Sequence, residues 1–178
     1  MKKLRGFEIQ NSLEEKCWKL SSYVLSQYDF EFLSHPGHEY WCIFNKYEQL
    51  FQTSFFKELI EVCGLIRSLL DSESLKVDKT IAGVSNDFGI LKNDKGAKTP
   101  LSFREACNKI IHSKKYSIEL NYSSIHPLDN GKNGYNNSEK DNFKDPKIVV
   151  MGERNGKNWT AEVDFLKFID QALNLIKR

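Results

Sequence analysis

Apolar residues recur at helical spacing in the first part of the chain and predict two long helices. The first helix is expected to begin near Ser12, because Ser12 and Glu15 match the capping-box pattern that satisfies free backbone N–H groups. An apolar stripe at spacings of three and four residues follows over residues 13–24. A second, longer stripe over residues 39–70 predicts the main core helix.

The next segment changes character twice before a third helix. Residues 85–98 are rich in Gly, Asn, Asp and Lys and predict a loop. Ser102 and Glu105 then repeat the capping-box pattern, so a helix is expected from Ser102 to about His112.

Alternating apolar and polar residues over 116–122 predict the first strand. A second strand is expected over residues 147–154, followed by a hairpin turn at Asn155-Gly156, since both residues tolerate positive φ. Trp159 lies in the third strand, and Asp164 is expected to cap the final helix.

Residues 127–146 show no periodic pattern, and their polar composition predicts a flexible, disordered loop. The expected fold class is α+β, mainly α: a helical bundle with a small antiparallel sheet inserted before the C-terminal helix. We expect a single domain over residues 1–178, helical over 1–115 and 164–178. The inserted β region would span residues 116–163.

Composition narrows the class of protein. The chain has 178 residues with 40% hydrophobic positions, which excludes a disordered protein. Cysteines 17, 42, 63 and 107 form no C-x-x-C pair, so they are expected to be reduced core residues. The N-terminus lacks the apolar run of a signal peptide. We therefore expect a soluble, cytoplasmic protein with no membrane partner, no cofactor and no metal.

Positive charge is concentrated in one stretch. Residues 92–115 carry seven basic and two acidic side chains, although the whole chain has a formal net charge of only +2. A basic patch of this kind favours phosphate-bearing partners. The alternative is a solvated, lysine-rich surface.

The third predicted helix carries the candidate chemistry. Arg104, Asn108 and His112 are spaced four residues apart, so they form a polar stripe along one side of the helix. Cys107 belongs to the opposite, apolar side.

The segment from Asn108 to His112, together with the two helices before it, resembles the HEPN superfamily of small helical bundles. Many members are dimeric, metal-independent ribonucleases of toxin–antitoxin and antiviral systems. Their motif has an Arg just before the polar residue, and this chain has Cys107 in that place. The resemblance implies a bacterial defence or toxin–antitoxin protein. It also implies a homodimer that binds RNA or a nucleotide and a cognate antitoxin protein.

The resemblance also implies residue roles. His112 would be the general base that takes the proton of the RNA 2′-hydroxyl, since imidazole titrates near neutral pH. Asn108 would orient the histidine or the phosphate, and Arg104 would stabilise the developing charge. The phosphate-binding residues would be Arg67, Lys109, Lys114 and Lys115. The alternatives are a catalytically inactive interaction or nucleotide/RNA-binding module, and a helical protein that matches the motif by chance.

Eight helical residues separate Arg104 from His112, which is about 12 Å of rise. One chain cannot easily place both on one phosphate, so the pair favours a site shared across a twofold dimer. Elsewhere, His35 and His38 have a spacing that could bind a metal ion, but the Pro-Gly pair between them favours a plain turn.

Overall fold

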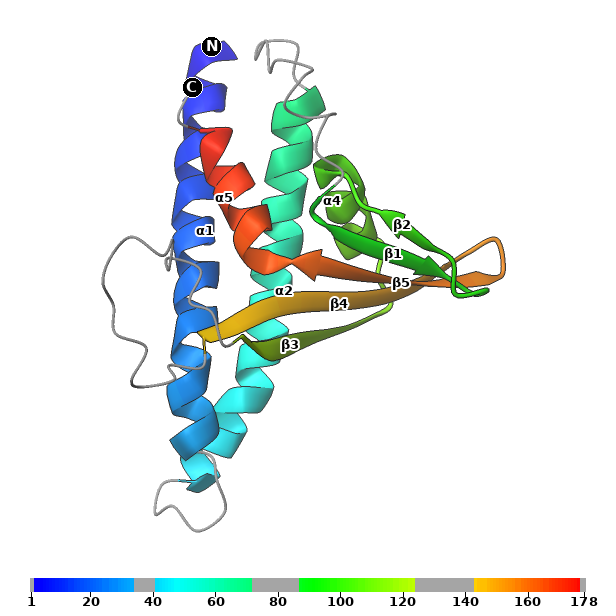
Figure 1. The fold of residues 1–178 in the computed structure, drawn as a ribbon. Coiled ribbons are helices and arrows are strands. Elements are labelled where there is room, and N and C mark those ends of the chain that lie inside the picture. The colour runs from blue at the N-terminus through cyan, green and yellow to red at the C-terminus, as the bar shows by residue number, and fades with distance from the viewer. Residues whose placement is uncertain (1, 34–40, 72–86, 124–142, 177–178) are drawn as a thin grey trace, which may run out of the picture.

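A computed structural model of the chain describes residues 2–33, 41–71, 87–123 and 143–176. Four helices and a five-stranded antiparallel sheet occupy these ranges (Figure 1). In chain order the elements are α1 (Lys2–Leu33), α2 (Trp41–Asp71), β1 (Gly89–Asn93), β2 (Lys98–Pro100), α4 (Phe103–Ile111), β3 (Lys115–Ser123), β4 (Phe143–Arg154), β5 (Lys157–Asp164) and α5 (Phe165–Asn174).

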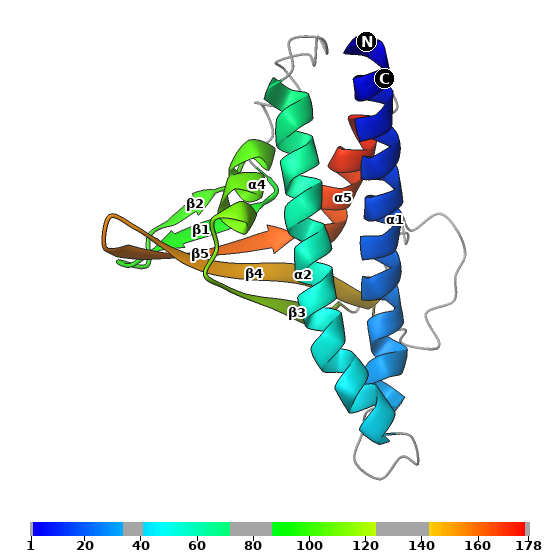
Figure 2. The ribbon, with the colours of Figure 1, turned by 180° about the vertical axis from the view of Figure 1, so that it is seen from behind.

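The two long helices α1 and α2 lie side by side, and the sheet extends away from them (Figures 1 and 2). Their apolar stripes face each other, with Leu13 and Leu20 of α1 and Leu59 of α2 fully buried. The α5 helix joins this core through Phe165, whose ring centroid lies 5.8 Å from that of Phe55. Burial of such large side chains is the main source of stability at this helix junction.

A charged network also links the two long helices. Lys16 of α1 lies 2.8 Å from Glu58 and 2.5 Å from Glu61 of α2, and Lys19 also pairs with Glu58. The hydrogen bonds from Lys16 and Lys19 hold the pKa of Glu58 below its ordinary value. Because the pKa of Glu58 is depressed in the folded protein, the network stabilises the fold above the carboxyl's ordinary pKa. That contribution is lost as the pH falls through the lowered value.

We expect Glu58→Gln to lower the free energy of unfolding at pH 7 by about 0.5 kcal/mol, because both lysines lose their shared anion. The melting temperature should fall by about 2 °C at pH 7, and the difference from wild type should disappear in strong acid. Glu15→Gln is the matched control, since it removes the same charge from an exposed position on α1. Calorimetric melting curves of the three proteins across pH 2–7 test this; an equal effect of both substitutions would contradict it.

The sheet has the strand order β2-β1-β5-β4-β3. The predicted hairpin between β4 and β5 is confirmed, with positive φ of 53° at Asn155 and 73° at Gly156. Strand β1 pairs with β5 far along the chain, with Gly89 opposite Val163. A Cβ at Gly89 would lie 1.9 Å from the carbonyl oxygen of Glu162, and its φ of +142° also favours glycine. Only glycine therefore fits at this position, where β1 pairs with β5.

Both prolines in the sheet occupy places where a missing N–H is tolerated. Pro100 ends the edge strand β2, and the next residue, Leu101, donates its N–H inward to the Gly89 carbonyl at 2.9 Å. Because alternate residues of a strand point their N–H groups to opposite sides, the nitrogen of Pro100 faces the outer side of the edge. Pro146 of β4 lies beyond Lys147, where pairing with β5 stops, so β3 is its only neighbouring strand. On the β5 side no strand is left that would need an N–H from this residue.

Helix α4 lies on the sheet beside α2 (Figure 2). The predicted capping box is confirmed: the Ser102 side chain accepts from the Glu105 N–H, and the Glu105 carboxylate accepts from the Ser102 N–H. Phe103 anchors the helix, with its ring centroid 5.2 Å from those of both Phe88 and Phe168. The first turn of α4 is thus fixed against α5 and against the residue that precedes β1.

The expected fold class is wrong. A five-stranded antiparallel sheet accounts for a substantial share of the protein, in place of a helical bundle with a small inserted hairpin. The expected loop over residues 85–98 contains β1 and the start of β2. These two strands add to the β4–β5 hairpin, so the sheet is not confined to residues 116–163. The physical reason is non-local: β1 has a weak pattern of its own and is stabilised by pairing with β5.

Three further predictions are wrong or concern residues outside the described ranges. Helix α1 begins by Lys2, so Ser12 and Glu15 lie inside it and do not cap it. Residues 143–146 belong to β4, because they pair with β3, while the rest of the expected 127–146 loop lies outside the described residues. His35 and His38 also lie outside them. Within the described ranges, no helix combines the length and apolar character needed to cross a membrane.

Candidate functional site

Helix α4 presents different side chains to three surroundings. Four of its apolar residues are buried in the core: Phe103, Ala106, Cys107 and Ile110. Arg104 and Asn108 contact residues of α2, whereas Lys109 points to Trp159 of β5. His112 follows the helix as its C-cap. The predicted polar stripe therefore faces the last turns of α2, and Lys109 serves another part of the surface.

Arg67 of α2 is joined to the predicted stripe by a direct hydrogen bond, in which its Nη1 donates to Oδ1 of Asn108. Asp71, one turn further along α2, lies 3.6 Å from Nη2 of Arg67 and accepts from Nη2 of Arg104 at 2.6 Å. We call these four residues, Arg67, Asp71, Arg104 and Asn108, the α2–α4 polar cluster. It holds two guanidinium groups around one carboxylate and carries a net charge of +1.

The cluster has a defined electrostatic balance. The hydrogen bond from Arg104 holds the pKa of Asp71 below its ordinary value, and the positive charge of Arg67 lowers it further. Asp71 is therefore ionised at neutral pH and positions both guanidinium groups. The Arg67 side chain is 31% exposed, while its Nε atom is buried and has no hydrogen-bond partner among the described residues.

Cys107 cannot replace the arginine that the HEPN motif has at this position. Its side chain has no exposed surface and contacts Cys63 of α2 in the core. Burial, together with that contact, raises the pKa of the Cys63 thiol well above its ordinary value, so it stays protonated. Cys17, Cys63 and Cys107 are buried free thiols, as predicted. The prediction is wrong for Cys42, which lies in the first turn of α2 and is exposed.

His112 lies one helical turn after Asn108, and its backbone N–H donates to the Asn108 carbonyl at 3.1 Å. Its side chain is exposed, and no described residue forms a hydrogen bond or ion pair with the imidazole. The four residues from Asn108 to His112 correspond to about 6 Å of rise, which a bound phosphodiester could span. The imidazole is thus accessible beside the cluster but is not oriented by a carboxylate within the described ranges.

The structure separates the three lysines that were expected to bind phosphate. Lys109 places its Nζ 4.4 Å from the centroid of the Trp159 ring, on the other side of α4 from Arg67. Lys114 forms an ion pair with Glu153 at 2.9 Å. Lys115 begins β3 and is exposed. Of the expected phosphate contacts, only Arg67 belongs to the polar cluster.

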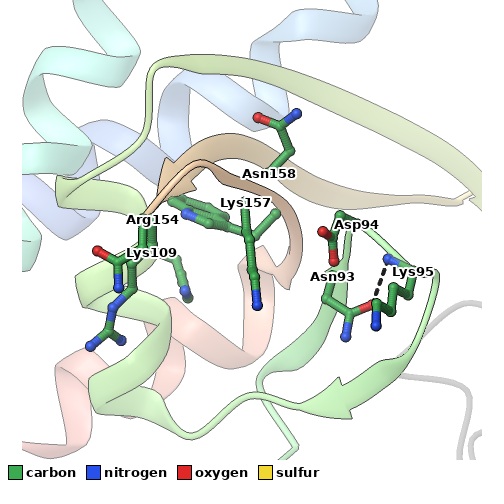
Figure 3. A pocket seen from close by; sticks show the side chains of 9 residues that line it. Asn93, Asp94, Lys95, Lys109, Arg154, Lys157 and Asn158 are labelled. Carbon is green, nitrogen blue, oxygen red and sulfur yellow. Dashed lines mark hydrogen bonds between the residues drawn. The ribbon is translucent and has the colours of Figure 1, made fainter.

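Sequence reasoning missed two features of this region. Asp71 had no recognisable motif, since its importance comes from two arginines that converge on it. The cationic residues Lys95, Arg154 and Lys157 come from two separate turns and gather near Lys109 only in the folded chain (Figure 3). The basic content of residues 92–115 was the one signal that pointed toward this surface.

In the part of the chain that the structure describes, no group of three or more His, Cys, Asp or Glu side chains is arranged to hold a metal ion. The chain matches no family model, no curated protein and no solved structure.

Proposed function

We propose that the protein binds RNA and cleaves it at the α2–α4 polar cluster, with His112 as general base and no requirement for a metal ion. The observation that carries this proposal is the hydrogen bond from Arg67 to Asn108, one turn before His112. It brings a guanidinium group from α2 to the motif whose own arginine position is occupied by buried Cys107.

The chemistry would use the RNA's own 2′-hydroxyl. His112 takes its proton, the 2′-oxygen attacks the adjacent phosphorus, and the bond to the 5′-oxygen breaks. The leaving 5′-oxygen gains a proton from solvent or from the protonated imidazole. Arg67 stabilises the charge that develops on the phosphate oxygens, because a guanidinium forms paired hydrogen bonds with them. Asn108 holds the guanidinium in place through its Oδ1 atom.

This arrangement changes the reason for expecting a dimer. The separation of Arg104 from His112 along one helix favoured a site shared by two subunits. Arg67 supplies a guanidinium within one chain, so a shared site is not required. The homodimer and the cognate antitoxin remain predictions, and light scattering at micromolar protein concentration tests the first of them.

A second candidate function is RNA or nucleotide binding without cleavage. Asp71 favours it, because this carboxylate already pairs with both guanidinium groups of the cluster. A phosphate would have to compete with Asp71 for them. In that case the protein would bind a labelled RNA and leave it intact.

The test is incubation of the purified protein with a short, 5′-labelled single-stranded RNA, with and without EDTA. We expect cleavage in both conditions, products that end in a 2′,3′-cyclic phosphate, and no cleavage of the same sequence made with 2′-O-methyl groups. Cleavage that needs a divalent ion, or that proceeds without a 2′-hydroxyl, contradicts the mechanism. Binding without cleavage selects the second candidate function.

We expect Arg67→Ala to reduce the cleavage rate by about 100-fold, a typical effect of removing one group that stabilises transition-state charge. Arg104→Ala should have a smaller effect, since Arg104 lies two turns from His112. Ser68→Ala is the matched control, because Ser68 is the exposed neighbour of Arg67 and, among the described residues, its hydroxyl donates only to the Gly64 carbonyl of its own helix. Single-turnover rates of the variants provide the measurement; equal rates for Arg67→Ala and Ser68→Ala would exclude a role for this guanidinium.

A further inference from the structure

A pocket of about 410 Å³ lies on the side of α4 that faces away from α2 (Figure 3). The β1–β2 turn, the β4–β5 turn and the last part of α4 surround it. This volume is in the range of small-molecule sites. We call it the basic pocket, after the four cations in its lining: Lys95, Lys109, Arg154 and Lys157.

The charge of the basic pocket is strongly one-sided. Among the described residues that line it, Asp94 is the single carboxylate. None of the four cations forms an ion pair within the described part of the chain, whereas Lys92 and Lys114, just outside the lining, are paired with Glu162 and Glu153. Unpaired cations that converge on one hollow repel one another, and an anion in the hollow would relieve that repulsion.

Lys109 is held in place on the floor of the pocket by Trp159. Its Nζ lies 4.4 Å from the centroid of the indole ring, a cation–π contact. The ring can lie across β4 because residue 152 is glycine: a Cβ there would be 2.2 Å from the Trp159 ring. Partial burial lowers the pKa of Lys109 from its ordinary value, and the positive charge of Arg154 lowers it further. The ammonium group is thus partly desolvated and lies near the like charge of Arg154, while the negative charge of Glu105 acts in the opposite direction.

Amide groups complete the lining. Asn155 and Asn158 come from the β4–β5 hairpin, and their side-chain NH₂ groups are hydrogen-bond donors that suit phosphate oxygens. The hairpin turn itself is fixed by the positive φ values of Asn155 and Gly156. The pocket therefore offers charge and hydrogen-bond donors on a scaffold of turns and helix.

We propose that the basic pocket binds a phosphate-bearing anion with two or more negative charges. A free nucleotide and the backbone of RNA share this chemistry. The site goes beyond the proposed cleavage activity, because Lys109 and the α2–α4 polar cluster lie on different sides of α4. It would act as a separate anchor, either for RNA next to the cleavage site or for a nucleotide ligand.

The test is calorimetric titration of the wild-type chain at low salt with pyrophosphate, with a nucleoside triphosphate and with a short 2′-O-methyl RNA, which the proposed mechanism does not cleave. The variant carries Arg154→Ala together with Lys157→Ala, two exposed positions whose loss should leave the fold intact. We expect the variant to bind the preferred anion at least about tenfold more weakly, since two charge-assisted contacts are lost. Lys98→Ala is the matched control, an exposed lysine on β2 outside the pocket, and it should change the affinity less than about twofold.

The three probes distinguish the sources of the anion. Tighter binding of the triphosphate than of RNA identifies a nucleotide site, and the reverse order identifies the RNA backbone. Failure of the wild type to bind any probe overturns the proposal, and so does equal affinity of the double variant and the wild type in a folded state. His112→Ala should leave pyrophosphate binding unchanged. Binding by a protein that cleaves no RNA would therefore count against the proposed function alone.

Discussion

Cys107→Arg is expected to unfold the protein instead of supplying a guanidinium to the motif. Cys107 has no exposed surface and packs against Cys63 of the neighbouring helix. An arginine at this place would put a large, unpaired charge into the core, at a cost on the order of 5 kcal/mol. That cost is comparable to the whole stability of many domains. Loss of a cooperative thermal transition, followed by circular dichroism, is the expected observation.

Cys107→Ala is the matched control for this prediction. It removes one buried sulfur atom without adding charge, so the protein should stay folded with a loss of about 1–2 kcal/mol. A folded Cys107→Arg variant would show that the core around Cys107 can open. If that variant also cleaved RNA faster than the wild type, position 107 and not Arg67 would be the place of the catalytic guanidinium.

His112→Ala is expected to reduce RNA cleavage by about 10²–10⁴-fold, the usual contribution of a general base. The fold should be unaffected, because the His112 side chain is exposed and makes no polar contact with the described residues. The melting temperature should therefore stay within about 1 °C of the wild-type value. Cleavage rates measured at saturating protein, together with melting curves, separate a chemical effect from a structural one.

RNA binding by the His112→Ala variant provides the second readout. We expect its affinity to stay close to that of the wild type, since the guanidinium groups of the α2–α4 polar cluster are retained. Undiminished cleavage by the variant would remove the general-base role. A large loss of affinity with unchanged turnover would instead make His112 a binding residue.

Local signals were sufficient for several elements of the fold. The capping box at Ser102 and Glu105, the cap at Asp164 and the turn at Asn155-Gly156 were predicted from neighbouring residues and are confirmed. Each of these features is stabilised by contacts within a few residues, so its pattern is complete in a short stretch of sequence. The long α2 helix was found for the same reason, from its continuous apolar stripe.

Elements stabilised by distant partners were missed. Strand β1 has little alternation of its own and forms because Gly89 and its neighbours pair with β5, more than sixty residues later. Its omission made the sheet look like a small insertion. In α1 the opposite error occurred, because a good capping pattern at Ser12 and Glu15 lies in the middle of a longer helix. A capping pattern permits a helix start but does not require one.

In the candidate site, too, local features were predicted from the sequence and contacts between distant residues were not. The spacing of Arg104, Asn108 and His112 correctly placed them on a polar side of α4, because helical periodicity decides that. The hydrogen bond between Arg67 and Asn108 links residues on two helices, and nothing in the spacing of either helix specifies it. The convergence on Asp71 depends equally on how α2 and α4 pack.

The edge of the sheet at β2 limits how two copies of this protein can associate. The strand is only three residues long, and its Pro100 nitrogen faces outward without a hydrogen to donate. A strand from another molecule would therefore have few N–H donors to pair with at this edge. The exposed side chain of Lys98 also lies there. Such features are how natural sheets resist edge-to-edge growth into aggregates. We infer that a dimer of this chain would not form by joining two sheets at β2, and that its contact surface lies elsewhere.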